Sequence, residues 1–176
     1  MKILNFKSSN GLKLIKFNKN KDNRGSFTRI FCKEIFLKNK IFNNLNQINL
    51  SQNLKAGTFR GFHFQKNPHG EAKVITCLSG KIFLCLLDVR KKSKTYLKIF
   101  TKTLEIKNSL AMYVPIGFAS AFLTLKDDTK ILYYMSKKFT PGSGSGINYQ
   151  DPNIKVKWPY KIKIISKKDT KLPYIK

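Results

Sequence analysis

Arginine, histidine and acidic residues are scarce in this chain. Four arginines leave 31 lysines among the 35 basic residues, against nine acidic residues and two histidines. Proteins that read nucleic-acid bases rely on arginine, whose guanidinium matches guanine and phosphate with paired hydrogen bonds. We therefore interpret the net charge of +26 as lysines solvated along the whole chain, and expect an attraction for small anions such as nucleotides but no nucleic-acid partner.

Cysteine and long apolar runs are also limited. The cysteines Cys32, Cys77 and Cys85 are odd in number and lack metal-ligand spacing, and the last two lie in apolar runs. Two histidines do not supply the usual metal-binding cluster of histidines with a carboxylate, so we expect no metal and no cofactor. No run approaches eighteen apolar residues, and the N-terminus lacks a secretion signal, so we expect a cytoplasmic protein with no membrane partner.

Short alternating or apolar segments fill the rest of the chain. The expected extended segments are 13–17, 27–31, 47–51, 72–78, 82–89, 95–104, 110–114, 118–125 and 130–135. Residues 118–125 and 130–135 are predicted to form a hairpin around 126–128, and Pro141–Gly146 a flexible loop. Only 32–42 has helical spacing. This pattern predicts an all-β sandwich or barrel with little helix, and no repeat or boundary divides the single domain 1–176.

The segment from Arg60 to Gln65 contains one of the two histidines. In a regular strand Arg60 shares one face with Phe62 and Phe64, while His63 lies on the other face beside Gln65. A histidine in this setting is either held structurally by its neighbours or directed into a pocket. The segment alone leaves both interpretations open.

Motifs along the chain resemble the dTDP-4-dehydrorhamnose 3,5-epimerase family in order and approximate spacing. They are Asp22-x-Arg24-Gly25-x-Phe27, Gln47-x-Asn49-x-Ser51, Arg60-Gly61-x-His63-x-Gln65, Lys73, Asp88-x-Arg90, Pro115-x-Gly117-Phe118-Ala119, Tyr133, Asp151-Pro152, Trp158-Pro159 and Ser166-x-Lys168-Asp169. The resemblance implies a jelly-roll β-sandwich of the cupin class, a homodimer and no metal. It also implies a nucleotide-diphospho-4-keto-6-deoxyhexose substrate, epimerised through an enolate for surface-polysaccharide sugar biosynthesis.

Epimerisation beside a ketone requires a base, a group that stabilises the enolate oxygen, and an acid. An imidazole titrates near neutral pH, which makes His63 the natural base. The resemblance implies Asp169 as its carboxylate partner, Lys73 as the cation at the enolate and Tyr133 as the acid. From the residues alone, Asp169 is equally an exposed acid in a lysine-rich tail, Lys73 a solvated edge lysine, and Tyr133 one of two strand aromatics.

A second set of residues is expected to bind substrate. Arg24 and Arg60 are two of four arginines and both lie in family motifs, and arginine binds phosphate through paired hydrogen bonds. The amides of Gln47, Asn49 and Gln65 are candidates for hydrogen bonds to sugar or base. The resemblance adds Phe27, Arg29 and Ser120 to this set. Arg90 is expected to anchor a turn beside Asp88 instead.

Five positions depart from the family pattern. Arg29 replaces a glutamate, Leu84 an aspartate, Ser120 a histidine, Phe139 a tyrosine and Ser145 an acid. The proposed base, its carboxylate, the lysine and the first tyrosine are retained. Two hypotheses follow: that the nucleotide or sugar differs from the dTDP-4-keto substrate because a charge is reversed at Arg29, and that only one centre, C3, is inverted.

Other functions remain open from the sequence. A 3,4-ketoisomerase acting on a differently linked keto sugar, with GDP or CDP as the nucleotide, also begins with removal of an α-proton. A catalytically inactive sugar-nucleotide-binding homologue would retain the fold and lose turnover. A nucleic-acid binder would show a steep dependence of affinity on salt.

Overall fold

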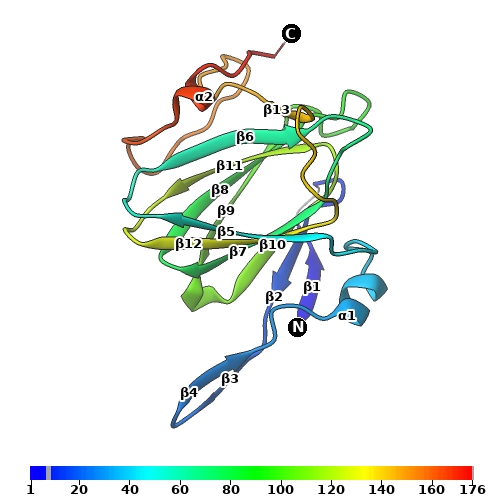
Figure 1. The fold of residues 1–176 in the computed structure, drawn as a ribbon, viewed down its shortest axis with the longest axis vertical. Helices are drawn as coiled ribbons and strands as arrows, with labels where there is room; N and C mark the ends of the chain where they lie inside the picture. Colours follow the sequence, from blue (N-terminus) through cyan, green and yellow to red (C-terminus); the bar gives the residue numbers. More distant parts are fainter. Residues whose placement is uncertain (7–8, 176) are drawn as a thin grey trace.

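The computed structural model describes residues 1–6 and 9–175. Two antiparallel sheets face each other and form a sandwich (Figure 1). In spatial order, the first sheet contains β1 (Lys2–Asn5), β2 (Lys13–Lys16), β10 (Leu110–Val114), β7 (Lys73–Ser79), β12 (Thr129–Met135) and β5 (Gln47–Asn53). The second sheet contains β13 (Gly144–Gly146), β6 (Phe59–Gln65), β11 (Phe118–Thr124), β8 (Lys81–Asp88) and β9 (Ile99–Glu105).

Helices are few and short in the described residues. They are α1 (Lys33–Lys38), α2 (Lys167–Thr170) and the 3₁₀ turn η1 (Ile106–Asn108). The predicted all-β sandwich with little helix is therefore confirmed. The helix expected at 32–42 is present but spans six residues, and neither α2 nor β1 was anticipated from the sequence. Among the described residues, no helix has the length and apolar character needed to cross a bilayer.

The core is built in three layers, because both sheets are covered on their outer faces. Ile75, Leu84 and Phe122 belong to the cluster between the sheets. Val74 packs outward in a second cluster with α1, while Phe62 packs outward in a third cluster with the C-terminal segment. Strands covered on both faces are apolar at successive positions, which explains the continuous apolar runs of β7 and β8.

From β5 onward most consecutive strands lie in different sheets, and β8 and β9 are the exception that pairs. The predicted hairpin of residues 118–125 and 130–135 is wrong: β11 pairs with β6 and β8, whereas β12 pairs with β5 and β7. The chain changes sheet at residues 125–128, where the backbone N–H of Leu125 bonds to the carbonyl of Lys81. Apolar periodicity identifies each strand but does not state which sheet it joins.

A β-bulge changes the facing of the strand that contains His63. His63 is opposite Ser120 and Arg60 is opposite Phe122, so Gly61 and Phe62 together face the single residue Ala121. The extra residue breaks the strict alternation, and the expectation that Arg60 and His63 lie on different faces is wrong. Gly61 has a φ of +136°, and a Cβ there would lie 2.4 Å from the Ala121 Cβ, so the bulge requires glycine.

Two loop assignments also need correction. Part of the stretch Pro141–Gly146, expected to be a flexible loop, forms β13, which pairs with β6 so that Gly146 is opposite His63. The strand expected at 95–104 begins only at Ile99, because the preceding residues form a turn held by the Asp88 carboxylate.

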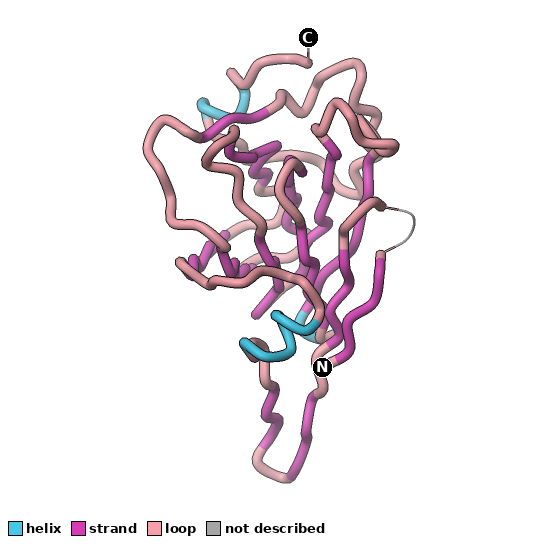
Figure 2. The backbone as a smooth tube through the Cα atoms, turned by 90° about the vertical axis from the view of Figure 1, so that its right-hand side faces the viewer, coloured by secondary structure: helices cyan, strands magenta, loops and turns pink. Residues whose placement is uncertain are grey.

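A separate hairpin projects from the sandwich. It consists of β3 (Lys19–Asp22) and β4 (Gly25–Thr28), which pair only with each other and extend away from both sheets (Figures 1 and 2). Every residue of β3 is exposed, and Phe27 in β4 has 73% of its surface exposed.

Candidate active site

A cavity of about 480 Å³ opens between the sheets and contains most of the predicted site residues. Strands β5, β7 and β12 contribute one side, and β6 and β11 contribute the other, with the α2 segment at the margin. The predicted residues that line it are His63, Lys73, Tyr133, Asp169, Gln47, Asn49, Arg60, Gln65 and Ser120. Residues separated by more than a hundred positions are thus brought to one cavity.

His63 and Asp169 form a close pair in this cavity. The His63 Nε2 atom lies 2.7 Å from Asp169 Oδ1, and the backbone N–H of Gly61 donates to Oδ2 over 3.3 Å. The imidazole is 44% exposed while the carboxylate is 5% exposed. Burial by itself raises the pKa of Asp169, but hydrogen bonding and the charge of His63, together with the Gly61 N–H, lower this pKa below its ordinary value. Asp169 is therefore an ionised, buried partner for the imidazole.

The C-terminal segment positions this carboxylate through α2. The Ser166 hydroxyl caps the helix by accepting a hydrogen bond from the Asp169 N–H over 3.0 Å. Asn148 holds the segment from the other side, because its amide donates to the carbonyl oxygens of Thr170 and Leu172. The acid is buried and fixed, so the alternative of an exposed tail residue does not apply.

Lys73 and Tyr133 lie on neighbouring strands of the opposite sheet. Tyr133 in β12 pairs with Ile75 in β7, and Lys73 is the next residue of β7 on that face. The Lys73 side chain is 7% exposed and is not a solvated edge lysine. Tyr134, adjacent in sequence to Tyr133, points to the outer cluster instead.

Burial strongly affects the Tyr133 phenol. It raises the pKa of Tyr133 well above the usual value, and the positive charge of Arg60 partly opposes this increase. Arg60 is therefore the cation whose charge acts on the Tyr133 phenol. The phenol therefore keeps its proton at neutral pH and can donate it.

Arg60 is oriented by a residue that the sequence analysis missed. Its Nε donates to Asn53 Oδ1 over 2.9 Å, and the Asn53 amide in turn donates to the Thr129 carbonyl and to Ser51. Asn53 is 2% exposed, so this arrangement is held inside the sheet. Arg60 lines the cavity, and a guanidinium held through Nε keeps its two terminal nitrogens available for an anion.

The three predicted amides are already bonded to the protein. Gln47 donates to Asn49 Oδ1 and accepts from the Phe139 N–H, each over 2.8 Å. Gln65, 8% exposed, accepts from Ser143 and donates to Glu71. Gln47 and Gln65 therefore support the cavity wall through both of their polar atoms, while Asn49 keeps its amide nitrogen for a ligand.

Glu71 is a cavity residue that the sequence analysis did not identify. Its carboxylate lies 3.2 Å from the ammonium of Lys73. The signal was present in the sequence, since residues two apart in an extended segment point to the same side. An extended backbone before β7, which begins at Lys73, therefore allows the acid at position 71 to lie beside this lysine.

Three predicted substrate-binding residues lie outside the cavity of their own chain. Arg24 and Phe27 belong to the β3–β4 hairpin, and Arg29 follows β4. The Arg24 side chain is 86% exposed and its guanidinium pairs with Asp22 over 2.7 Å. One chain by itself does not bring these side chains to His63.

Four of the five departures from the family pattern line the cavity. They are Leu84, Ser120, Phe139 and Ser145. Leu84 is fully buried and Phe139 is 62% exposed, so the replacements affect both the floor and the mouth. The fifth, Arg29, is exposed beyond the cavity.

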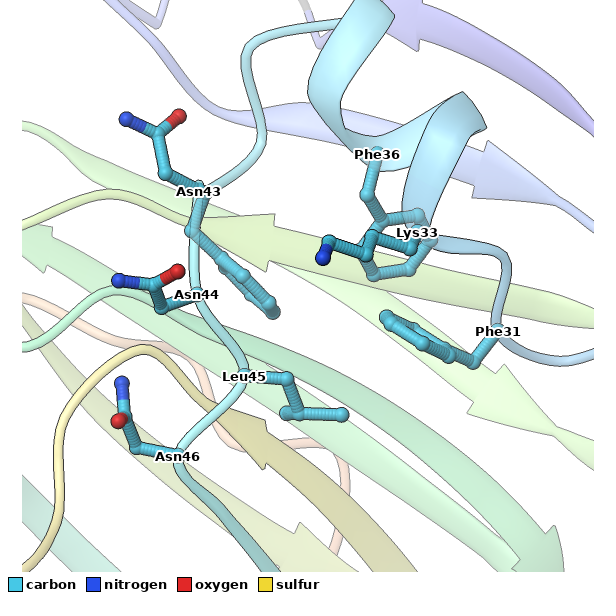
Figure 3. Close-up of a pocket in the computed structure, with 8 residues that line it drawn as sticks. Phe31, Lys33, Phe36, Asn43, Asn44, Leu45 and Asn46 are labelled. Atoms are coloured by element: carbon cyan, nitrogen blue, oxygen red, sulfur yellow. The ribbon is translucent and has the colours of Figure 1, made fainter.

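A second pocket of about 330 Å³ lies beside α1 (Figure 3). Its lining combines aromatic rings such as Phe31 and Phe36 with Asn43, Asn44 and Asn46, and includes no histidine or carboxylate. Among residues 1–6 and 9–175, no cluster of three or more histidine, cysteine or acidic residues is arranged to hold a metal ion.

Comparisons with known proteins agree on one family. The family model for dTDP-4-dehydrorhamnose 3,5-epimerase matches residues 7–176. An enzyme of that name from Sinorhizobium fredii is 37% identical over 163 residues, which are 92% of this chain and 84% of that protein. The crystal structure of the Bacillus anthracis dTDP-4-dehydrorhamnose 3,5-epimerase with TDP and PPi bound superposes with a TM-score of 0.94 at 32% identity, covering 99% of both chains. A 3'-monoepimerase from Streptomyces bikiniensis in complex with dTDP-quinovose gives a TM-score of 0.87 at 27% identity, covering 93% of this chain and 83% of that one.

The fold and the cavity define a jelly-roll enzyme of the cupin class, with a histidine–carboxylate pair facing a lysine and a tyrosine across the sandwich. The comparisons narrow this class. The chain belongs to the dTDP-4-dehydrorhamnose 3,5-epimerase family and is a carbohydrate epimerase of deoxysugar biosynthesis.

Proposed function

We propose that this protein epimerises a dTDP-linked 4-keto-6-deoxyhexose at carbons beside the ketone, using only its own side chains. The observation that carries the proposal is the 2.7 Å contact between His63 and Asp169 in a cavity that also contains Lys73 and Tyr133. Epimerisation through an enolate moves protons and no other group, so a base, an acid and a stabilising cation are sufficient.

His63 removes the α-proton. When the imidazole Nε2–H donates to Asp169, the Nδ1 lone pair is the basic position. Asp169 holds the ring in that tautomer and stabilises the imidazolium that forms, as carboxylates do in other base–orienter pairs. The 44% exposure of His63 at the cavity wall leaves its ring accessible to the substrate.

Lys73 and Tyr133 complete the reaction from the opposite sheet. The ammonium of Lys73 stabilises the negative charge on the enolate oxygen, and the Tyr133 phenol returns a proton. Because His63 comes from β6 and Tyr133 from β12, the base and the acid approach a bound sugar from different sides. Inversion requires this arrangement, since return of the proton to the original face regenerates the substrate.

The diphosphate is bound by arginine. Arg60 serves it within the cavity, and we propose that the hairpin of a second copy brings Arg24 and Arg29 to it and brings Phe27 to the same cavity. The hairpin projects from its own sandwich, and the edge strand β5 exposes Ile48 and Leu50 beside a cavity wall. An edge strand with exposed apolar side chains favours pairing with another chain. The protein is then a homodimer with two composite sites.

The nucleotide follows from the relatives of this chain. A nucleotide or sugar other than that of the dTDP-4-keto substrate was expected because of the charge reversal at Arg29, whereas the family model and the Sinorhizobium fredii relative are both dTDP-4-dehydrorhamnose 3,5-epimerases. The related Bacillus anthracis structure contains TDP. We therefore propose dTDP, and a cytoplasmic location in keeping with a nucleotide-sugar substrate and three free cysteines.

A second candidate is inversion at C3 alone. The specific observation is that Leu84, Ser120, Phe139 and Ser145 all line the cavity, so the surroundings of the sugar differ from the family pattern. A structurally similar relative is a 3'-monoepimerase. The two candidates share the same base and differ in which carbon is presented to it.

One experiment tests the function and separates the candidates. The protein is incubated in heavy water with dTDP-, GDP-, CDP- and UDP-linked 4-keto-6-deoxyglucose, and NMR follows deuterium at C3 and C5. We expect turnover of the dTDP sugar, its loss in His63→Ala, and its retention in the matched control His69→Ala, because His69 is exposed and outside the cavity. Deuterium at C3 alone would identify a C3 monoepimerase. A product with its carbonyl at C3 would identify a ketoisomerase. If no sugar exchanges its α-hydrogen, the proposed function is wrong.

A further inference from the structure

Glu71 and Lys73 form an ion pair within the cavity wall. The Glu71 Oε1 atom lies 3.2 Å from Lys73 Nζ, and the two side chains are 9% and 7% exposed. Pairs so little exposed to solvent interact more strongly than surface pairs, and loss of one partner leaves a buried charge without compensation. The position and the charge of Lys73 therefore depend on the Glu71 carboxylate.

The second carboxylate oxygen is held as firmly as the first. Glu71 Oε2 accepts a hydrogen bond of 2.5 Å from the Gln65 amide, and Gln65 Oε1 accepts one from the Ser143 hydroxyl. Ser143 is also bonded to the Thr140 carbonyl over 2.6 Å. Glu71 is thus fixed by the segment leading into β13, and it fixes Lys73 in turn.

The charges that line the cavity make Glu71 the counter-ion of Lys73. The cationic side chains in the lining are Arg60, Lys73 and Lys168, and the carboxylates are Asp169 and Glu71. Asp169 is bonded to His63 on the opposite sheet. Glu71 is the carboxylate in contact with the ammonium, while Arg60 and Lys168 carry the same sign of charge as Lys73.

We propose that Glu71 is a positioning residue that holds Lys73 in its ammonium form and directs it at the enolate oxygen. The inference rests on the proposed function, because it assigns Lys73 to that oxygen. A buried amine without a counter-ion favours its neutral form, which donates more weakly to an oxyanion. The carboxylate maintains the charge on which the enolate depends, and no proton needs to leave the pair during turnover.

The test is the pH dependence of kcat in Glu71→Gln. Glutamine retains the size of the side chain and its ability to hydrogen-bond, but removes the charge. We expect the alkaline limb of the profile to move to lower pH by about one unit or more. At pH values on that limb kcat then falls about tenfold, with KM changed less than twofold and activity largely recovered at lower pH. Glu34→Gln, the same change on an exposed residue of α1, should superpose on the wild type.

Two further variants distinguish this role from a general effect on folding. Glu71→Asp keeps the charge and should restore the alkaline limb toward the wild-type position. In a Lys73→Ala background, Glu71→Gln should cause no further loss of kcat, since its effect passes through the lysine. An unshifted profile in Glu71→Gln, or losses that multiply in the double variant, would overturn the inference.

A readout without turnover separates this inference from the proposed function. Brief acetylation with acetic anhydride at increasing pH, followed by peptide mass spectrometry, reports where each lysine becomes reactive. Lys73 should react at lower pH in Glu71→Gln than in the wild type, while the exposed Lys130 reacts identically in both. If the wild type epimerises no sugar but Lys73 shifts, the pairing holds and the proposed function fails. If the wild type is active and Lys73 does not shift, the inference fails alone.

Discussion

The Asp169 carboxylate has opposing influences on its charge. Its side chain is only 5% exposed, which favours the protonated acid, but its bonds to His63 and to the Gly61 N–H favour the carboxylate and leave its pKa below the ordinary value of 3.8. A group whose pKa is lower in the folded state stabilises the fold above the unfolded pKa, and this contribution is lost as pH falls through the folded pKa. Asp169 therefore remains charged throughout the pH range in which an imidazole base works.

Asp169→Asn tests whether that charge supports the base. Asparagine occupies the same space but lacks the charge and selects the wrong imidazole tautomer, so we expect kcat to fall roughly 10²- to 10⁴-fold. KM for the nucleotide sugar should change only a few-fold. Steady-state kinetics measures both, with Asp128→Asn on an exposed turn as the matched control. A kcat within threefold of the wild type would remove Asp169 from the mechanism.

Tyr133 and Tyr134 form a natural matched pair of phenols. Tyr133 lines the cavity, whereas the Tyr134 hydroxyl is buried in the outer cluster and has no hydrogen-bond partner among the described residues. Burial raises the pKa of both, that of Tyr134 to about 12. Both phenols are therefore protonated at neutral pH, but only the first faces the substrate cavity.

Tyr133→Phe should separate proton removal from proton return. His63 still forms the enolate, so we expect exchange of the α-hydrogen with heavy water to continue while the inverted product falls about 10²-fold or more. Tyr134→Phe should retain activity and thermal stability, because it removes a buried hydroxyl without a bonding partner. NMR of the deuterated sugars measures exchange and inversion together. If α-hydrogen exchange and inversion fall equally in Tyr133→Phe, Tyr133 acts in proton removal and not only in proton return.

At the scale of elements, the turn after β8 is organised by one buried carboxylate. Asp88 is 0% exposed and accepts hydrogen bonds from Arg90, Ser93 and Thr95 over 2.6–3.0 Å. Burial favours the neutral acid, but these donors outweigh it and lower the pKa of Asp88 to about 2. The predicted structural role of Arg90 is confirmed. The turn delivers the chain to β9, and it explains why that strand begins later than expected.

Asp88→Asn should destabilise the protein by about 2–4 kcal/mol, because it leaves the partly buried Arg90 without its counter-ion. The wild type should also lose about 2 kcal/mol of stability as pH falls from 3.8 to 2, the interval between the unfolded and folded pKa values of Asp88. Asp88→Asn should lack this loss of stability between pH 3.8 and 2. Urea unfolding of both proteins between pH 2 and 6 measures it, and parallel curves would contradict the assignment.

Individual strands were predictable from the sequence, while their partners were not. Apolar runs located β7, β8 and β11 within one or two residues because each is buried on both faces. The same runs contain no information on sheet membership, which depends on contacts distant in sequence. β13 was missed because Gly144–Gly146 has no apolar pattern and is ordered only by pairing with β6.

At the scale of the whole molecule, the site depends on long-range contacts. His63 meets Asp169 across 106 positions, and the resemblance, not the local sequence, suggested that pair. Local reasoning failed where geometry departs from a regular strand: the bulge at Gly61 placed Arg60 beside His63 against the expected alternation. Glu71 was missed although its spacing from Lys73 was visible, because no motif drew attention to it.

The projecting hairpin leads to a prediction about two copies. If Arg24 serves the cavity of a partner, a mixed dimer of one His63→Ala chain and one Arg24→Ala chain contains a complete site: the second chain provides His63 and the first provides Arg24. Co-expression with two different tags and tandem purification isolates this species. We expect about half of the wild-type kcat/KM, because one of two symmetric sites is intact, while each parent dimer is at least tenfold lower.

A mixed dimer of His63→Ala and Asp169→Asn is the matched control for complementation. His63 and Asp169 lie in the same cavity of one chain, so each of the two sites in that dimer lacks one of them and activity should stay at the level of the parents. If the His63→Ala and Arg24→Ala dimer is equally inactive, Arg24 does not act across the interface. If no mixed dimer is recovered from the second affinity column, the chain does not form dimers. The hairpin must then serve some purpose other than completing a neighbouring site.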